Sequence, residues 1–349
     1  MSSSIRPPRR TALLVGINYR GTADELNGCY NDVVNVSQYL RTSLGYSESS
    51  VSVLTDGNRD SPAFPASVAP TRQNIIAGMA ALVAGMVAGD EAVFHFSGHG
   101  TLVRDTNGDE LTGLDSCLCP LDYNAPSAAG GGVVTDDEIR ALLVNKVPRG
   151  ARLYVFLDCC HNGTGCDVRF KYEDFSILLR PPSARTAAIW RTQQKAFANP
   201  KYTETAGEVF MISGSRDEQT SADAYINNAF AGALTYAVFA ILRANQASIR
   251  TYSWSSLLRD VRHFMRANRY SQIPQIMTGQ LITPARPVFA VAAVAAGARG
   301  GAALELSSGA SGAVSRGVSA SDSPATIFSF RPKSGSKPTT PRRCIQFIH

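Results

Sequence analysis

The chain has 349 residues, enough for one large domain or two small ones, and its hydrophobic share of 44% supports a sizeable buried core. The net charge of +6 is modest and lies largely in the terminal segments, and no nucleic-acid-binding motif is present, so we expect no nucleic-acid partner. Seven cysteines, two of them adjacent, do not form the pattern of a secreted disulfide framework, so we expect an intracellular, cytoplasmic protein.

The first hundred residues alternate between strand and helix patterns. Residues 1–10 predict a disordered tail without the apolar core of a signal peptide. Uniformly apolar runs predict buried strands, and apolar residues at helical spacing predict helices. The strands are expected at 11–17, 51–55 and 91–96, the helices at 31–44 and 71–87, and a loop at 56–70. This βαβαβ order predicts an α/β fold with a parallel, doubly wound sheet.

The second part of the chain is less regular. Residues 100–132 predict a long, polar, Gly-rich connection, and residues 168–205 predict an irregular segment. Between and after them we expect strands at 153–157, 209–213 and 276–278, and helices at 136–143, 233–244 and 255–268. From Pro284 onward the Ala/Gly/Ser-rich sequence predicts disorder, and its longest apolar run is too short to span a bilayer.

Two of the predicted strands run directly into reactive side chains. Leu153–Leu157 leads into Asp158-Cys159-Cys160-His161, and Glu91–Phe96 leads into Ser97-Gly98-His99-Gly100. The carboxyl ends of neighbouring parallel strands meet at one edge of a sheet. We therefore expect a Cys–His pair, in which the imidazole raises the thiolate fraction and later protonates the leaving group. The alternative is an ordinary buried thiol and an unrelated histidine.

These strand endings resemble the two active-site signatures of metacaspases, cysteine peptidases of the caspase-like clan. Phe96–Gly100 and Leu157–Gly163 carry the resemblance. Further segments agree in the family's order, at 12–19, 26–33, 133–138, 209–214, 219–223, 232–236 and 272–275. The resemblance implies a caspase-like three-layer sandwich, with a mostly parallel central sheet flanked by helices.

The resemblance also implies a domain organisation. The peptidase domain is expected over 11–282, with a large-subunit-like part to about 167, a linker at 168–205 and a small-subunit-like part at 206–282, followed by a low-complexity tail at 283–349. The short linker is similar to that of type I metacaspases. Its basic residues are candidate self-cleavage points: Arg180, Arg185, Arg191, Lys195 and Lys201.

The resemblance assigns the catalytic roles. Cys160 is the nucleophile, because the family's thiol stands immediately before His-Ser/Asn-Gly, and His99 is the general base and acid. Cys159 is then packed or accessory, since neighbouring strand residues point to opposite faces. Backbone N–H groups near Gly100 and Cys160 are expected to stabilise the oxyanion.

Substrate choice follows from the same resemblance, which implies an S1 pocket for Arg or Lys lined by Cys29, Asp32, Ser97 and Asp158. A buried carboxylate pair can hold a guanidinium or ammonium group by charge-assisted hydrogen bonds, whereas a pocket for Asp would need Arg. The alternative for Asp32 is a solvated charge on the first helix. We expect protein or peptide substrates with Arg or Lys at the cleavage site, and a monomer.

A calcium site is the last element that the resemblance implies. Asp105–Asp109 looks like the start of an EF-hand loop but fails as one, because Glu110 stands at the Gly position and Ser116 at the final Glu position. The resemblance points instead to Asp115, Asp136, Asp137 and Asp167 as ligands of an activating Ca²⁺. The alternative is that Asp136 and Asp137 only stabilise a helix start after Thr135.

The sequence thus predicts a calcium-dependent cysteine endopeptidase that cleaves after Arg or Lys. A caspase-like fold does not guarantee catalysis, so one alternative is a catalytically weak or inactive pseudopeptidase that acts as a binding or scaffold module. A second is a redox-sensing protein that uses the thiols of Cys159, Cys160 and Cys166. The additional Cys117 and Cys119 lack the histidine spacing of a zinc site.

Overall fold

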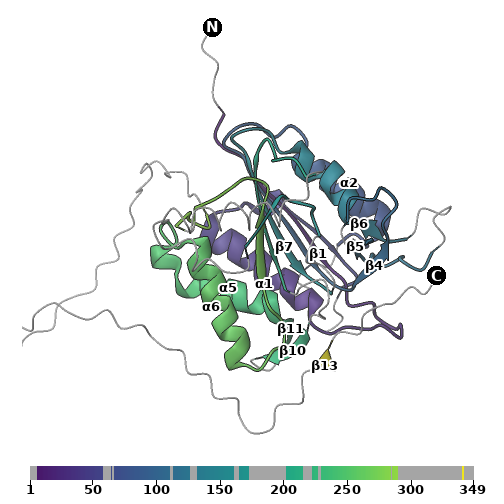
Figure 1. The fold of residues 1–349 in the computed structure, drawn as a ribbon. Helices are drawn as coiled ribbons and strands as arrows, with labels where there is room; N and C mark the ends of the chain where they lie inside the picture. The colour runs from purple at the N-terminus through teal and green to yellow at the C-terminus, as the bar shows by residue number, and fades with distance from the viewer. Residues whose placement is uncertain are drawn as a thin grey trace, which may run out of the picture. The chain divides into compact units, whose positions relative to one another are not determined.

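In the computed structural model of the chain, a seven-stranded sheet in the order β2-β1-β3-β7-β9-β12-β8 forms the centre (Figure 1). The structure describes residues 6–57, 64, 67–110, 113–125, 132–160, 165–172, 202–214, 222–226, 229–283, 285–289 and 340–341. The parallel strands are β1 (Arg10–Gly16), β2 (Val51–Thr55), β3 (Glu91–Ser97), β7 (Arg152–Asp158) and β9 (Glu208–Ser213). At the far edge, β12 (Gln275–Thr278) runs antiparallel to both β9 and β8 (Phe170–Tyr172).

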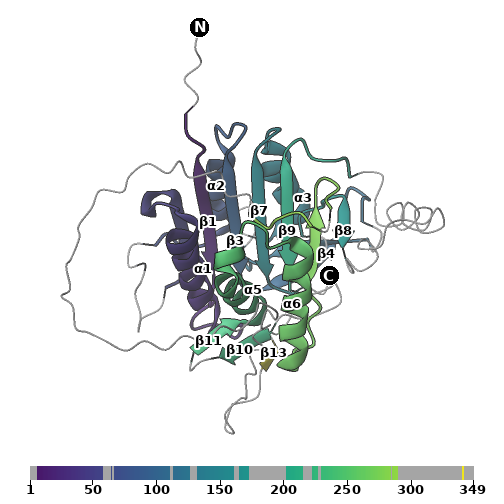
Figure 2. The same ribbon diagram turned by 90° about the vertical axis from the view of Figure 1, so that its left-hand side faces the viewer.

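Helices cover both faces of this sheet. On one face lie α1 (Cys29–Leu44), α5 (Ala233–Ala244) and α6 (Trp254–Ala267), and on the other lie α2 (Arg72–Val83) and α3 (Asp136–Leu142) (Figures 1 and 2). Short 3₁₀ turns occur at Glu48–Ser50, Val144–Lys146 and Gln246–Ser248. The predicted three-layer α/β sandwich with a mostly parallel central sheet is therefore confirmed. None of the described helices is long and apolar enough to cross a membrane.

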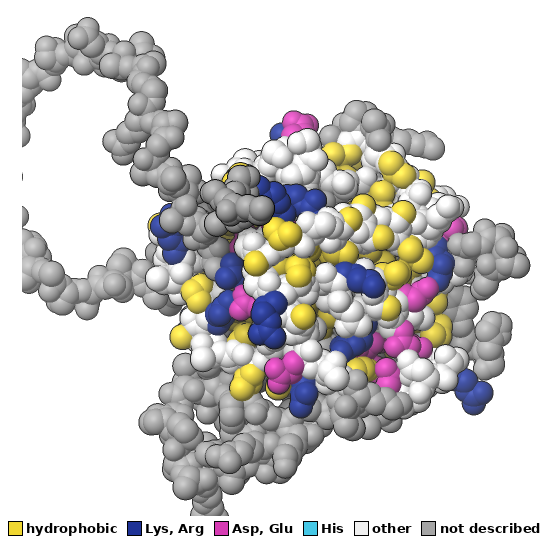
Figure 3. Space-filling view, turned by 90° about the horizontal axis from the view of Figure 1, so that it is seen from above, with side chains coloured by type: hydrophobic (Ala, Val, Ile, Leu, Met, Phe, Trp, Pro, Cys, Tyr) yellow, Lys and Arg dark blue, Asp and Glu magenta, His cyan; other side chains and the backbone are white. Residues whose placement is uncertain are grey.

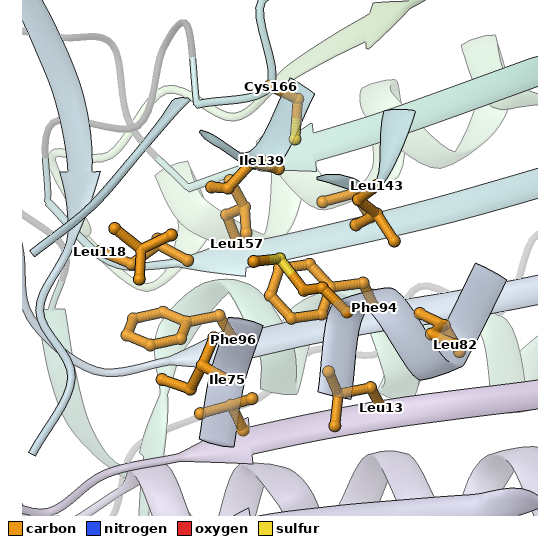
Figure 4. Close-up of a cluster of buried hydrophobic side chains, with 14 of the residues drawn as sticks. Leu13, Ile75, Leu82, Phe94, Phe96, Leu118, Ile139, Leu143, Leu157 and Cys166 are labelled. Carbon is orange, nitrogen blue, oxygen red and sulfur yellow. The ribbon is translucent and has the colours of Figure 1, made fainter. Parts of the chain in front are cut away.

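Successive side chains of the central strands point to opposite faces of the sheet, so the core has two parts. Leu153, Val155 and Leu157 of β7 belong to a cluster on the face of α2 and α3, which Figure 4 shows together with Phe94 of β3. The intervening residue Tyr154 lies in an aromatic cluster on the other face. Its ring stacks on Phe210 at 5.5 Å, and Phe210 stacks on Trp254 at 5.1 Å.

Charged residues align the strands at the amino edge of the sheet. Arg10, Glu91, Arg152 and Glu208 are register partners on β1, β3, β7 and β9. Glu91 lies 3.1 Å from Arg10 and 3.3 Å from Arg152, and Arg152 lies 2.7 Å from Glu208. Figure 3 looks onto this end, where basic and acidic side chains lie side by side among apolar ones. Opposite charges on adjacent strands favour this register over a slipped one.

Three segments differ from the sequence prediction. The predicted long connection over 100–132 instead contains β4 (Gly100–Arg104) and β5 (Leu114–Leu118), which form a small antiparallel sheet with β6 (Val134–Thr135). The predicted irregular segment 168–205 contains β8, and residues 173–201 lie outside the described part. The second helix ends at Val83 rather than 87, because Gly85 adopts a left-handed conformation with φ of +64°.

A second small sheet consists of β10 (Ala222–Ile226), β11 (Ala229–Gly232) and β13 (Thr340–Pro341), none of which the sequence indicated. Packing also extends beyond the predicted domain limits of 11 and 282. The Arg6 guanidinium donates to the Asp90 carboxylate at 2.8 Å, and Val288 and Phe289 are buried. Most of the predicted tail, 283–349, lies outside the described residues.

Candidate active site

The turns that carry His99 and Cys160 touch at the carboxyl edge of the sheet. In the parallel pair β3–β7, Ser97 is the register partner of Asp158, so both turns begin at the same level. The backbone N–H of Gly98 donates to the carbonyl of Asp158 at 3.4 Å. A Cβ on Gly100 would lie within 3.0 Å of the Cys160 carbonyl oxygen, so only glycine fits. The structure thus brings the two predicted catalytic residues together, with His99 1% exposed and Cys160 buried.

The two adjacent cysteines have different surroundings. Cys159 belongs to the same hydrophobic cluster as Leu157 and Cys166. Figure 4 shows the sulfur of Cys166 pointing into that cluster beside Ile139. Cys160 is buried but is not part of the cluster. This difference agrees with Cys160 as the nucleophile and Cys159 as a packing residue.

The hydrogen bond of His99 defines its tautomer. Nε2 lies 2.7 Å from the backbone carbonyl oxygen of Asp24. A carbonyl oxygen can only accept, so Nε2 carries the hydrogen and Nδ1 of the neutral ring carries the lone pair. Nδ1 is therefore the nitrogen that can take a proton from a thiol. Asp24, in the segment between β1 and α1, was not indicated by any sequence motif.

The four residues predicted to bind substrate lie around the same edge. Cys29 and Asp32 are in the first turn of α1, one helical turn apart, and Ser97 and Asp158 end β3 and β7. The hydroxyl of Ser97 donates to Asp32 Oδ2 at 2.6 Å. Both Asp32 and Asp158 are fully buried, so the interpretation of Asp32 as a solvated surface charge is wrong.

Backbone N–H groups at the start of α5 stabilise both carboxylates. Gly232, the N-cap of α5, donates to Asp32 Oδ1 at 2.9 Å, and Thr235 donates to Asp158 Oδ2 at 2.9 Å. The amino end of a helix carries a partial positive charge that favours anions. Two ionised carboxylates can therefore stay buried here, and their combined charge suits a cationic group.

An acidic cluster lies near this edge of the sheet. It contains all four predicted metal ligands, with Asp115 on β5, Asp136 and Asp137 in the first turn of α3, and Asp167 after β7. It also contains three residues of the segment between β4 and β5 that sequence reasoning did not assign: Asp105, Asp109 and Glu110. Side-chain oxygens lie within 4.8 Å of one another in three groups, Asp105/Asp109/Asp115, Asp109/Asp137/Asp167 and Glu110/Asp136/Asp167. The only sign of these three residues in the sequence was that they lie close together, within positions 105–110.

The electrostatics of this cluster fit a cation. Burial and neighbouring carboxylates raise the pKa of Asp115 to about 6 and that of Asp167 to about 10. Burial is also the main cause that raises the pKa of Asp136 to about 8. Asp115 Oδ1 is buried and has no hydrogen-bond partner in the described part of the chain. Hard carboxylate oxygens that repel one another form the kind of donor set that Ca²⁺ prefers.

The alternative role for acids at this position, stabilising the start of α3, applies to the neighbouring Glu138. Thr135 and Glu138 form a capping box, in which Glu138 Oε2 accepts from the Thr135 N–H at 3.2 Å. Asp136 instead accepts from the Ser116 N–H on β5 at 2.8 Å, and Asp137 accepts from the Asn107 side chain at 2.6 Å. These two acids connect α3 to the β4–β5 hairpin rather than only capping the helix.

The remaining thiols do not favour the redox hypothesis. None of the described cysteines forms a disulfide. Burial raises the pKa of Cys119 and of Cys166 well above the ordinary value, so both stay protonated at neutral pH. A protonated, buried thiol reacts slowly with oxidants. His161, next to the nucleophile, and the basic residues proposed as self-cleavage points lie outside the described residues.

Known proteins of one family resemble the chain in sequence. Residues 10–169 match the family model described as metacaspase, peptidase C14 domain. The chain is 36% identical to Metacaspase-1 of Mycosarcoma maydis over 302 residues, which cover 78% of this chain and 71% of that protein. It is 35% identical to Metacaspase-1 of Pyricularia oryzae, covering 77% and 71% of the two chains. A solved structure of a Geobacter sulfurreducens protein, 25% identical, has a TM-score of 0.50 and matches 80% of this chain and 97% of its own.

Proposed function

The chain belongs to the metacaspase family of cysteine endopeptidases, and from this premise we propose that it is a calcium-dependent endopeptidase that cleaves after Arg or Lys. One observation carries the proposal. A single sheet edge holds Cys160 and His99 on touching turns, together with the buried carboxylates of Asp32 and Asp158. A thiol, a base and an anionic pocket are the groups that this reaction needs.

In the proposed mechanism, His99 Nδ1 takes the proton of the Cys160 thiol. The thiolate attacks the carbonyl carbon of the scissile peptide bond, and backbone N–H groups stabilise the oxyanion. When the C–N bond breaks, the imidazolium gives its proton to the leaving amine. Water then hydrolyses the thioester, with the imidazole again acting as base. The Nε2–H bond to the Asp24 carbonyl orients the ring throughout.

The proposed S1 pocket recognises the positive charge of the substrate. A guanidinium or ammonium group is attracted by Asp32 and Asp158, with Ser97 and Cys29 as further lining residues. A substrate carboxylate would be repelled by the same pair. Because both carboxylates are fully buried, the pocket opens only if the segments over them shift when substrate binds.

Calcium would be held by Asp115, Asp136, Asp137 and Asp167, with Asp109 and Glu110 close enough to contribute. The bound cation would neutralise the repulsion among these carboxylates and hold together the segments that carry them. Two of these segments lead into the active site. Asp115 lies on β5, the partner of β4, which directly follows His99. Asp167 follows Cys160 along the chain.

The test is hydrolysis of fluorogenic peptides that end in Arg, Lys or Asp, with calcium in excess and with a chelator, for wild type and Cys160→Ala. The proposal expects turnover of the Arg and Lys peptides only, and loss of turnover with the chelator and with the variant. Turnover by Cys160→Ala would refute the assigned nucleophile. A folded wild-type protein without turnover under any condition would favour the pseudopeptidase alternative.

A further inference from the structure

The imidazole of His99 is held by a network that extends beyond the hydrogen bond to Asp24. The Tyr123 hydroxyl donates to Asp24 Oδ2 at 2.6 Å, so the residue whose carbonyl accepts from His99 is itself fixed by a side chain. On the other side, the backbone N–H of His99 donates to the Tyr19 hydroxyl at 2.9 Å, and that hydroxyl donates to the Cys119 carbonyl at 2.5 Å.

The rings of this network also pack together. The Tyr19 ring lies 4.7 Å from the His99 ring, and it meets the Tyr123 ring edge-on at 6.1 Å. Tyr19 has a positive φ of 50°, which is uncommon for a residue with a bulky side chain. Such a conformation persists where several contacts fix it, and it occurs often beside functional groups.

The hydrogen bond between Asp24 and Tyr123 joins an exposed segment to a buried residue. Asp24 is half-buried in the irregular segment between β1 and α1, among exposed residues. Its own backbone N–H is bound only locally, by the Thr22 hydroxyl at 3.2 Å. Tyr123 is 7% exposed and belongs to the segment that follows β5. Burial and the bond to Asp24 raise the pKa of Tyr123 to about 12, so the hydroxyl remains a donor at all working pH values.

We propose that Tyr123 and Asp24 are a positioning pair for His99, which keeps hydrogen on Nε2 and leaves Nδ1 as the base. This inference rests on the proposed role of His99 in the reaction. Neither side chain touches the reacting atoms in this account. The pair fixes the carbonyl that receives Nε2–H, as outer partners of a ligating or catalytic imidazole do in other sites. Without it the ring is free to turn or to change tautomer, and the fraction of molecules with a correctly oriented base falls.

The chain offers a matched control for this test. Tyr252 donates to Asp260 Oδ2 at 2.6 Å, the same bond at the same length as that of Tyr123, and it is 8% exposed. Tyr252 lies just before α6 and Asp260 lies within that helix, and neither is in the His99 network. Tyr123→Phe and Tyr252→Phe therefore remove the same hydrogen bond from a similarly buried ring.

The experiment measures kcat and KM of the full chain at saturating calcium, the melting temperature, and the pH dependence of Cys160 alkylation by iodoacetamide, followed by mass spectrometry. Alkylation reports the thiolate fraction and needs no peptidase activity. The titratable groups around His99 are Tyr19, Asp24, Cys119 and Tyr123, together with Cys160. We expect Tyr123→Phe to lower kcat by about tenfold, the effect of one lost hydrogen bond to a charged group. KM should stay within about twofold, since no substrate contact is changed.

The two phenylalanine variants should lower the melting temperature by similar amounts, but Tyr252→Phe should keep the wild-type kcat and alkylation profile. For Tyr123→Phe the alkylation midpoint should move to higher pH. Asp24→Asn, which can still accept from Tyr123, should retain more activity than Asp24→Ala. Equal kcat and equal alkylation profiles in the two phenylalanine variants would overturn the inference. A wild type that is inactive on peptides, but whose alkylation profile shifts with Tyr123→Phe, would support the positioning pair and contradict the proposed function.

Discussion

Replacing Asp32 with Asn tests the proposed pocket, because it removes one negative charge without changing the size of the side chain. The structure indicates a small cost in stability. In the structure the Gly232 N–H donates to Asp32 Oδ1 at 2.9 Å, and the amide oxygen of the variant side chain can accept that bond in its place. The amide nitrogen can donate to the Ser97 hydroxyl, which now donates to Asp32 Oδ2. Both partners keep a hydrogen bond, so we expect a loss of only about 1 kcal/mol in the free energy of unfolding.

Substrate recognition should also be weakened, because the cationic group of the substrate loses a charged partner. A hydrogen bond to a charged group contributes about 1.5–3 kcal/mol, against about 1 kcal/mol for a neutral one, so the difference is about 0.5–2 kcal/mol. Since about 1.4 kcal/mol corresponds to a factor of ten, Asp32→Asn should lower kcat/KM for an Arg peptide by about 2- to 30-fold. A peptide with citrulline, which has the shape of arginine without its charge, should lose little.

The assay compares kcat/KM for the Arg and citrulline peptides in wild type, in Asp32→Asn and in Glu48→Gln. The last is the control, because the Glu48 side chain is 84% exposed and forms its ion pair with Arg41 at the surface. The ratio of kcat/KM for the Arg peptide to kcat/KM for the citrulline peptide separates the effect of the charge from a general loss of activity. An unchanged Arg-to-citrulline ratio in Asp32→Asn would refute the reasoning, whatever happens to the absolute rates.

Three further predictions concern stability and metal binding. Gly100→Ala places a methyl group against the Cys160 carbonyl and should lower the free energy of unfolding by about 1–3 kcal/mol, with a loss of activity, measured by denaturant titration and peptide turnover. Asp115→Asn should weaken calcium affinity by at least about tenfold in calorimetry, because it changes a buried oxygen for which the described residues provide no hydrogen-bond partner. Burial acts to raise the pKa of Asp90, but the Arg6 guanidinium and two backbone N–H groups bring it below the ordinary value. The ionised Asp90 therefore stabilises the folded state above about pH 4, the usual pKa of Asp, and this contribution is lost as the pH falls through the lower folded-state pKa. Asp90→Asn should make the free energy of unfolding fall less steeply with pH on the acid side.

Each of these predictions has a control or a contradicting result. Gly78→Ala adds a methyl group that meets only the flexible end of Leu13, so it should be tolerated, and equal damage in both glycine variants would contradict the steric argument. Calcium affinity unchanged by Asp115→Asn would exclude Asp115 as a ligand. An acid limb as steep in Asp90→Asn as in wild type would show that other carboxylates control acid unfolding.

The sheet and the main helices could be predicted because their sequences carry strong local patterns. All seven residues of β3 are buried, and its inner residues Ala92–Phe96 are apolar except for one histidine. The meeting of His99 and Cys160 followed from one rule, that neighbouring parallel strands end at the same edge. The same rule placed Asp158 at that edge, because Asp158 ends the strand that leads into Cys160. Asp32 was placed there only through the resemblance to metacaspases.

The short antiparallel elements were missed because their patterns are weak. β5 reads Leu-Asp-Ser-Cys-Leu, and its polar residues Asp115 and Ser116 are buried, with Asp115 in the acidic cluster. The hydrogen bond from His99 to Asp24 could not be predicted either, since a backbone carbonyl leaves no trace in the side-chain pattern. Tertiary contacts outweigh local preference in both places.

The most direct test of the central claim is to digest a mixed peptide library with calcium and to identify every cleavage site by mass spectrometry, in parallel for wild type and Cys160→Ala. We expect Arg or Lys immediately before each cleaved bond, and no cleavage by Cys160→Ala. Cleavage after Asp, or cleavage that persists in Cys160→Ala, would contradict it.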